Sequence, residues 1–130
     1  MPEKIFVDTG GFFAFLNADD PDHKDAVRRL QDGKKITTNY VFDELVTLLA
    51  ARGKRDLSVA FGEQLRTGRM VTVHFVTPRE EEKAWQVYKK YRDHPLSFTD
   101  CTTLMMLRQH RIPDLLSYDG ALLKAAKNIS

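Results

Sequence analysis

Four carboxylates in this sequence lie where predicted strands end or predicted helices begin: Asp8, Glu44, Asp100 and Asp119. An α/β fold would bring these positions together. Grouped carboxylates repel one another, and a hard divalent cation is the usual remedy. Because the ligands would be oxygens, with no clustered Cys or His beside them, Mg²⁺ or Mn²⁺ suits the group better than zinc. Acidic metal sites of this kind serve phosphoryl chemistry, in which the ions activate water and stabilise the leaving oxygen.

Each acid, taken alone, also has a simpler structural explanation. Asp8 and Asp119 suit the N-cap positions of the helices predicted after them. Asp100 suits a helix dipole or a cap pair with Ser97. Glu44 lies beyond the reach of a cap, so its alternatives are an arginine partner or a side chain that extends to water. The group of four, rather than any single member, favours a functional site.

The stretch 39–52, NYVFDELVTLLAAR, has a strong helix pattern with two adjacent acids. At about 100° per residue, Asp43 points away from the apolar stripe while Glu44 lies at its border. We therefore expect Asp43 to face solvent and Glu44 to face a crevice that also holds Asp8 and Asp100.

Hydrophobic periodicity and turn residues predict strands that alternate with pairs of helices. Thr77-Pro78-Arg79-Glu80 predicts a helix start, because it is a capping box with proline at the first helical position. Asp20-Pro21 predicts another start, with Gly33 as the stop. The expected strands cover residues 5–7, 35–38, 71–76 and 115–118, and the expected helices cover 12–16, 21–32, 39–52, 55–66, 78–91, 97–110 and the residues after 119.

This order of elements predicts an α/β fold with a short, mostly parallel sheet of about four strands, flanked by helices. No linker or repeat interrupts the chain, so we expect a single domain over residues 1–130. The net charge of +2 does not by itself require a nucleic-acid partner. The lone Cys101 excludes an intramolecular disulfide, and the first apolar run is too short for a signal peptide or a membrane span. A cytoplasmic protein is expected.

Four segments, in this order, resemble the PIN-domain ribonucleases, and most closely the VapC-type toxins of toxin–antitoxin systems: IFVDTGGFFAFLNADDPDH, TTNYVFDELVTLL, LSFTDCTTLMML and LLSYDGAL. The resemblance covers nearly the whole chain. It implies a PIN-like three-layer α/β/α fold with the first strand central in the sheet. It also implies an endoribonuclease that depends on Mg²⁺ or Mn²⁺, with a catalytic and metal-binding quartet formed by Asp8, Glu44, Asp100 and Asp119.

The same resemblance implies supporting residues and partners. The hydroxyl residues Thr9 and Thr99 would support the acids beside them. Family members usually form homodimers and are neutralised by a small DNA-binding antitoxin. RNA, a second copy of the chain and an antitoxin are therefore the expected partners, and no membrane is expected.

A mechanistic hypothesis follows from this quartet. Asp8 and Asp100 would make the main metal contacts, Glu44 would hold a second metal or a metal-bound water, and Asp119 would support that shell. Water activated by the metal would attack the phosphodiester in line. Because this attack needs no 2′-hydroxyl, a preference for RNA must come from the groove.

Residues outside the quartet have less specific patterns. The basic residues Lys54 and Arg55, between two predicted helices, are candidates for holding the RNA backbone. The four histidines are scattered without metal-ligand spacing, which predicts solvated or core positions. Trp85, Tyr88 and Tyr91 recur at helical spacing, which predicts packing rather than base stacking.

Two other enzyme or signalling classes fit poorly. A phosphoacceptor receiver domain would need an acidic pair straight after the first strand, whereas Thr9 and Gly10 follow Asp8. A phosphatase with a nucleophilic Asp would need a second Asp at position 10, which is Gly. The sequence leaves open a housekeeping RNA-processing nuclease without an antitoxin, and a catalytically silent module that binds RNA or protein.

Overall fold

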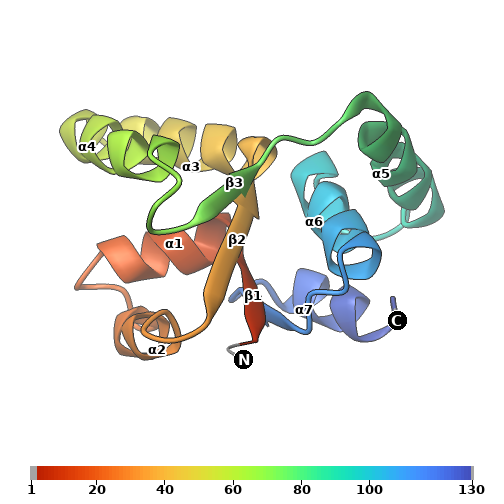
Figure 1. Cartoon of the computed structure of the whole chain (residues 1–130), viewed down its shortest axis with the longest axis horizontal. Coiled ribbons are helices and arrows are strands. Elements are labelled where there is room, and N and C mark those ends of the chain that lie inside the picture. The colour runs from red at the N-terminus through yellow and green to blue at the C-terminus, as the bar shows by residue number, and fades with distance from the viewer. Residues whose placement is uncertain (1–2, 130) are drawn as a thin grey trace.

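The computed structural model describes residues 3–129, in which strands alternate with helices in the order β-αα-β-αα-β-αα-β-α (Figure 1). This is the order that the sequence predicts. The strands are β1 (Lys4–Val7), β2 (Lys34–Thr38), β3 (Thr72–His74) and β4 (Asp114–Leu116). The helices are α1 (Thr9–Leu16), α2 (His23–Arg29), α3 (Asn39–Ala51), α4 (Arg55–Arg66), α5 (Pro78–Lys90), α6 (Phe98–Gln109) and α7 (Gly120–Lys127).

The strands form one parallel sheet in the order β3-β2-β1-β4, so β1 is an inner strand, as the resemblance implies. The register pairs Phe6 of β1 with Ile36 of β2 on one side and with Leu115 of β4 on the other. Because parallel neighbours end at the same edge of a sheet, the residues that follow β1 and β4 reach that edge together.

Helices cover both faces of this sheet. Parallel strands are joined by right-handed crossovers, so a reversal of direction along the sheet moves the connecting helices to the other face. Figure 1 shows α1 to α4 on one side of the strands and α5 to α7 on the other. The predicted three-layer α/β/α fold is therefore confirmed.

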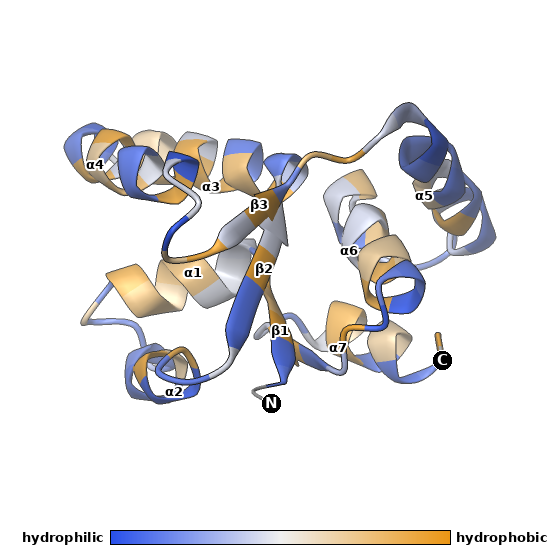
Figure 2. Cartoon of the chain, viewed as in Figure 1, coloured by the Kyte–Doolittle hydropathy of each residue, from blue (hydrophilic) through white to orange (hydrophobic). Residues whose placement is uncertain are grey.

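Apolar side chains from both helical layers seal the sheet. Phe6 and Val7 of β1 are fully buried, as are Leu45 of α3 and Leu104 of α6. Figure 2 shows α1 as largely hydrophobic and α5 as largely hydrophilic. This difference fits their positions, since α1 packs against both α2 and α3 whereas α5 lies over α6 as an outer helix.

Several predicted boundaries are wrong. The helix expected over residues 12–16 begins at Thr9, because Asp8 caps it, and the helix expected over 21–32 ends at Arg29, before Gly33. The strand expected over 115–118 covers Asp114–Leu116. The helix expected from Pro21 begins at His23, because the preceding residues form a turn in which Asp20 Oδ1 accepts the N–H of Asp22 at 2.8 Å. The strand expected over residues 71–76 covers only 72–74, because it lies at the edge of the sheet and pairs with β2 alone.

Among residues 3–129, no helix is long and apolar enough to cross a membrane.

Candidate active site

The four acids lie on segments that meet at the C-terminal edge of the sheet. Asp8 directly follows β1, and Asp119 follows β4 as the N-cap of α7. Asp100 lies in the first turn of α6, and Glu44 lies in the second turn of α3. Like charge from Asp119 and Glu44 acts on Asp100. The negative charges of Asp100 and Asp119 act on Asp8. Asp100 is therefore the acid that interacts with each of the other three.

Asp8 is the most deeply buried of these acids, with 7% of its surface exposed. Burial raises the pKa of Asp8 to about 6. Hydrogen bonds from the Ser117 side chain and the Gly11 backbone N–H, the latter at 2.8 Å, oppose this rise in pKa. The charges of Asp100 and Asp119 add to it. A nearby cation would offset both the desolvation and the repulsion.

Asp100 has a similar environment with a different anchor. Burial raises the pKa of Asp100, and the Ser97 backbone N–H, which donates to Asp100 Oδ2 at 3.0 Å, opposes the rise. The charges of Asp119 and Glu44 raise this pKa further. The Asp100 N–H in turn donates to Ser97 Oγ at 3.0 Å, which completes a capping box at the start of α6.

All three aspartates make capping contacts. Asp8 Oδ1 caps α1, and Asp119 Oδ1 caps α7 by accepting the N–H groups of Ala121 and Leu122 at 2.9 and 3.1 Å. A cap fixes the direction of a carboxylate and leaves its second oxygen for another ligand. The capping explanation offered for each of the three aspartates is correct, and these contacts also fix the directions of their carboxylates.

The two adjacent acids of α3 face different ways, as the sequence predicts. Asp43 is exposed, whereas Glu44 is half-buried and its charge acts on Asp100. Within residues 3–129, no ion pair involves Glu44. The arginine partner that was the alternative explanation for Glu44 is therefore not found in this part of the chain.

The hydroxyl residues beside two of the acids differ in their surroundings. Thr9 is buried, and its Oγ1 has no hydrogen-bond partner among the residues that the structure describes. Buried hydroxyls are normally satisfied by a partner, so this oxygen is suited to a ligand, a water or an ion. Thr99 is half-buried next to Asp100, and its carbonyl accepts the Thr102 hydroxyl at 2.6 Å.

The basic residues Lys54 and Arg55 lie apart from the acids. Both are exposed, and α4 begins at Arg55. About two turns of α3 and a short loop separate them from Glu44. Contacts of these two residues with RNA stay a prediction, and such contacts would concern RNA at a distance from the acids.

Ser117 is a site residue that the sequence interpretation missed. Its side chain is buried, hydrogen-bonds to Asp8 and accepts the backbone N–H of Asp119 on its Oγ at 3.1 Å. Ser117 thereby joins the acids that follow two neighbouring strands. Its only signal in the sequence is a small hydroxyl residue two positions before an acid, which specifies no partner.

Aromatic rings on α5 pack against one another and against α6, as their helical spacing predicts, and two of them remain partly exposed. The rings of Trp85 and Tyr88 on α5 stack at 5.4 Å, yet these residues remain 45% and 38% exposed. Both rings also contact Phe98 at the start of α6, at 6.3 and 5.9 Å. Tyr40 of α3 meets Phe98 at 5.7 Å. We call these four residues, Tyr40, Trp85, Tyr88 and Phe98, the aromatic surface.

The aromatic surface is anchored on the helices that carry two of the acids. Phe98 lies two residues before Asp100 on α6, and Tyr40 lies one turn before Glu44 on α3. Residues one turn apart share a helix face, so Tyr40 and Glu44 lie on the same side of α3. Tyr40, whose ring meets Phe98, therefore lies beside Glu44.

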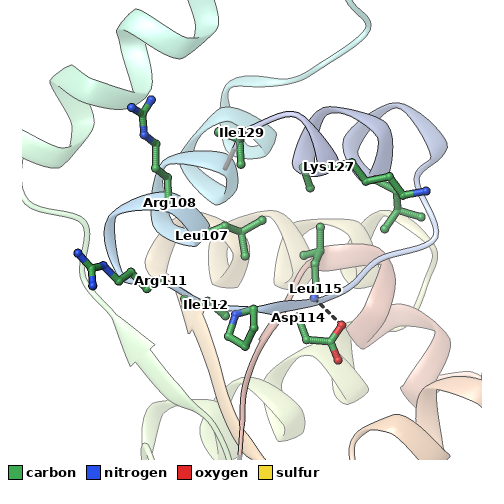
Figure 3. A pocket seen from close by; sticks show the side chains of 11 residues that line it. Leu107, Arg108, Arg111, Ile112, Asp114, Leu115, Lys127 and Ile129 are labelled. Atoms are coloured by element: carbon green, nitrogen blue, oxygen red, sulfur yellow. Dashed lines mark hydrogen bonds between the residues drawn. The ribbon is translucent and has the colours of Figure 1, made fainter.

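A hollow of about 650 Å³ elsewhere on the molecule is separate from the acids (Figure 3). The end of α6, the start of β4 and α7 line it, and none of the four acids is among its lining residues. Asp114, which begins β4, is among the lining residues. Because β4 begins here and the acids lie where the strands end, the hollow is at the opposite edge of the sheet.

The histidines are less scattered in space than in the sequence, which corrects another expectation. His74 and His110 both hydrogen-bond to Glu80, and ligand atoms of the three lie within 4.8 Å of one another. Within residues 3–129, no other three His, Cys, Asp or Glu residues are grouped so closely. The four acids are thus spaced more widely than this cluster.

Comparisons with known proteins agree with the fold. The PIN domain model matches residues 5–128. The 23S rRNA-specific endonuclease VapC20 of Mycobacterium tuberculosis is 34% identical over 119 residues, which cover 89% of each chain. The VapC ribonuclease of Archaeoglobus fulgidus is 28% identical over 121 residues, covering 88% of this chain and 76% of that protein. The crystal structure of Mycobacterium tuberculosis VapC20, a sarcin-ricin loop cleaving toxin, superposes with a TM-score of 0.85 at 32% identity and covers 93% of this chain and 94% of that one.

Proposed function

This chain belongs to the PIN domain family as a VapC-type ribonuclease, and we propose that it hydrolyses RNA phosphodiester bonds with Mg²⁺ or Mn²⁺ as the toxin of a type II toxin–antitoxin pair. One observation carries the proposal. Acids from four separate segments share the C-terminal end of the sheet: Asp8, Glu44, Asp100 and Asp119. Burial raises the pKa of Asp8 and of Asp100, and the charges of Glu44 and of the exposed Asp119 add to this effect.

The donor set fits a hard divalent cation, because it offers carboxylate oxygens and a hydroxyl. Asp8 and Asp100 are the proposed main ligands, since both have a raised pKa that a bound cation would lower. Glu44 and Asp119 are proposed to complete the shell from either side of Asp100. When bound, the ion supplies an activated water and offsets charge on the leaving oxygen.

The chain's own part in catalysis is to hold these groups before the substrate arrives. The Gly11 N–H and the Ser117 side chain fix the Asp8 carboxylate, and the Ser97 N–H fixes that of Asp100. Groups fixed in advance need no reorganisation during the reaction. The unpartnered Thr9 hydroxyl is proposed to bind a substrate phosphate or a water in the same shell.

A loop of ribosomal RNA is the proposed substrate. Its support is the named activity of VapC20, which acts on 23S rRNA and cleaves the sarcin-ricin loop. Proteins recognise RNA loops by stacking unpaired bases on aromatic side chains. The exposed rings of Trp85 and Tyr88 would provide such a platform next to the acids, with Lys54 and Arg55 contacting the backbone further away.

The proposed setting is the bacterial or archaeal cytoplasm, where the toxin forms a homodimer. A small DNA-binding antitoxin would neutralise it by covering the acids. Light scattering on the purified chain should give twice the mass of one chain, and a monomer at every concentration would refute the homodimer. Co-purification of a small protein that is encoded in the same operon and binds over the four acids would identify the antitoxin.

The activity is tested by cleavage of an end-labelled rRNA fragment that contains the sarcin-ricin loop, with a fragment of scrambled loop sequence as the matched control. We expect one main cut within the loop in Mg²⁺ or Mn²⁺ and none in EDTA. A 2′-deoxy nucleotide on the 5′ side of the cut should leave the rate unchanged, because the attacking group is water. Equal cutting of both fragments would refute the loop as substrate while leaving the nuclease itself intact.

Growth after induced expression separates a toxin from a housekeeping nuclease or a silent binding module. The proposal predicts growth arrest that the Asp8→Asn substitution relieves. Normal growth together with cleavage in vitro would favour the housekeeping enzyme. Absence of cleavage by the folded protein would favour the silent module.

A further inference from the structure

His74, Glu80 and His110 form a second group of metal-ligand side chains, away from the four acids. His74 Nε2 lies 2.7 Å from Glu80 Oε1, and His110 Nε2 lies 2.8 Å from Glu80 Oε2. The three residues come from the end of β3, the first turn of α5 and the C-cap of α6. We propose that these side chains bind a zinc ion, at a site independent of the nuclease centre.

Two imidazole nitrogens and one carboxylate form a ligand set that zinc uses when its fourth position is open. The Glu80 side chain is only 5% exposed, whereas the side chains of His74 and His110 are 29% and 33% exposed. The carboxylate thus forms the closed back of the site, and the imidazoles line an opening to solvent. A water from that side can occupy the fourth position.

The spacing of the ligand atoms is close to what zinc requires. Zinc–ligand bonds of about 2.0–2.1 Å in a tetrahedron separate neighbouring ligand atoms by about 3.3 Å. The nitrogen–oxygen distances of 2.7 and 2.8 Å, which go to different oxygens of Glu80, need to lengthen by about half an ångström. The more widely spaced ligand atoms, all within 4.8 Å of one another, need to approach. The partial exposure of both imidazoles leaves room for this small movement.

Hydrogen-bond donors around the cluster already orient the Glu80 carboxylate. The Thr77 N–H donates to Glu80 Oε1 at 3.0 Å, and Gln109 Nε2 donates to Glu80 Oε2 at 2.8 Å. Lys83 Nζ holds the Gln109 side chain through its Oε1 at 2.7 Å. Outer partners of this kind fix the direction of metal ligands and raise metal affinity.

The charge of the cluster also suits a cation. Burial raises the pKa of Glu80, but hydrogen bonds from the Thr77 N–H and from both imidazoles outweigh it and lower the pKa to about 2. Glu80 is therefore ionised under all ordinary conditions. With neutral imidazoles the cluster has one negative charge. On zinc binding, the Nε2 proton that each imidazole donates to Glu80 would move to Nδ1 by a change of tautomer, so that three coordinate bonds would replace two hydrogen bonds.

The ion would act on structure rather than on cleavage. His110 lies ten residues after Asp100, which is about 15 Å along α6. Bound zinc would tie the edge strand β3 to α5 and α6, and thereby stabilise the helix that carries Asp100. Imidazole-rich sites favour zinc, whereas oxygen-only sites favour Mg²⁺ and Mn²⁺, so the two centres select different ions.

The test is a calorimetric titration of Zn²⁺ into the Asp100→Asn variant, in which the nuclease centre is impaired. We expect about one ion per chain, a rise in melting temperature with Zn²⁺, and visible absorption of a Co²⁺-loaded sample. His74→Gln and His110→Gln should each abolish all three signals. His94→Gln is the matched control, because His94 is exposed and outside the cluster, and it should retain them.

The proposal is overturned if the protein takes up no Zn²⁺, or if uptake survives both cluster substitutions. The first result would leave the cluster as a hydrogen-bonded contact between β3, α5 and α6. Should the variants fail to fold, the proton NMR signals of the histidine rings in the unsubstituted protein provide the test. Zn²⁺ must then shift the ring signals of His74 and His110 and leave those of His23 and His94 in place.

Discussion

The Ser117 side chain hydrogen-bonds to the Asp8 carboxylate where β4 and β1 end side by side. The Ser117 Oγ also accepts the backbone N–H of Asp119, so one hydroxyl links two of the four acids. This bond lowers the pKa of Asp8 against the effect of burial. Ser117 therefore helps to keep a buried carboxylate ionised and directed at the proposed ion.

Ser117→Ala should weaken the response to Mg²⁺. Without the hydrogen bond the pKa of Asp8 rises further, and loss of a partner that orients a ligand typically costs about 10- to 100-fold in metal affinity. The measurement is the Mg²⁺ concentration that gives half-maximal cleavage. Ser58→Ala is the control, because Ser58 is also buried but donates to the Val46 carbonyl between α3 and α4. Equal Mg²⁺ requirements in both variants would show that Ser117 does not contribute to Mg²⁺ binding.

Asp8→Asn should stabilise the ion-free protein while it abolishes activity. The folded pKa of Asp8 lies above its ordinary value, so the stability linked to it is present below about pH 4 and is lost as pH rises through about 6. At 1.36 kcal/mol per pKa unit, the shift from 3.8 to about 6 corresponds to about 3 kcal/mol above that range. Urea unfolding in EDTA should show a gain of about 1–3 kcal/mol at about pH 8 that fades toward pH 4. A loss of stability at about pH 8 would contradict the burial argument.

The Mg²⁺ requirement of the unsubstituted enzyme should depend on pH. Below the Asp8 pKa of about 6, a proton competes with the ion for the same carboxylate. The half-saturating Mg²⁺ concentration should therefore rise about tenfold per pH unit below that value and level off above it. Mg²⁺ titrations of the cleavage rate across this range provide the measurement. A flat profile would mean that Asp8 is not a ligand.

Trp85→Ala should impair RNA binding more than the chemical step. Loss of one base–aromatic stack costs about 1–3 kcal/mol, or roughly 5- to 150-fold in KM, with little change in kcat. Trp85→Phe should restore much of the affinity, because the ring remains. Met70→Ala is the control, since Met70 is 38% exposed and precedes β3 at the opposite edge of the sheet. Unchanged KM in Trp85→Ala would exclude the aromatic surface from substrate binding.

Gly11→Ala should damage the fold at the site, whereas Gly10→Ala should not. A Cβ at Gly11 would lie 2.7 Å from the Leu116 carbonyl oxygen, which is backbone of the neighbouring strand and cannot move aside cheaply. We expect a loss of about 1–3 kcal/mol in the free energy of unfolding. At Gly10 the nearest atom is Asp8 Oδ1 at 3.6 Å, an ordinary contact, and alanine favours the helix. Equal stability of the two variants would contradict this close approach of α1 to β4.

Local signals in the sequence were sufficient for the order of elements and for the places of the four acids within them. The capping boxes at Thr77 and Ser97 are formed by residues three apart, so the pattern alone specifies the contact. The separation of Asp43 from Glu44 follows in the same way from helix geometry. The length of β3 could not be predicted, because it depends on how far the edge strand meets β2 and not on its own composition.

Contacts between distant segments were beyond the sequence. His74 and His110 are separated by 35 intervening residues and meet only because α5 and α6 bring Glu80 between them. Helical spacing placed Trp85 and Tyr88 on one face, but it could not show that this face remains partly open to solvent. In each case the missing information was which surfaces pack together.

The most direct test of the central claim compares RNA cleavage by the unsubstituted protein and by Asp100→Asn, in Mg²⁺ and in EDTA. Asn keeps an oxygen that can accept the Ser97 N–H at the start of α6, so the variant should fold. It loses the negative charge that interacts with each of the other three acids. The account predicts cleavage in Mg²⁺, none in EDTA, and a rate for Asp100→Asn that is at least about a hundredfold lower. A folded Asp100→Asn variant that cleaves as fast as the unsubstituted protein would contradict it.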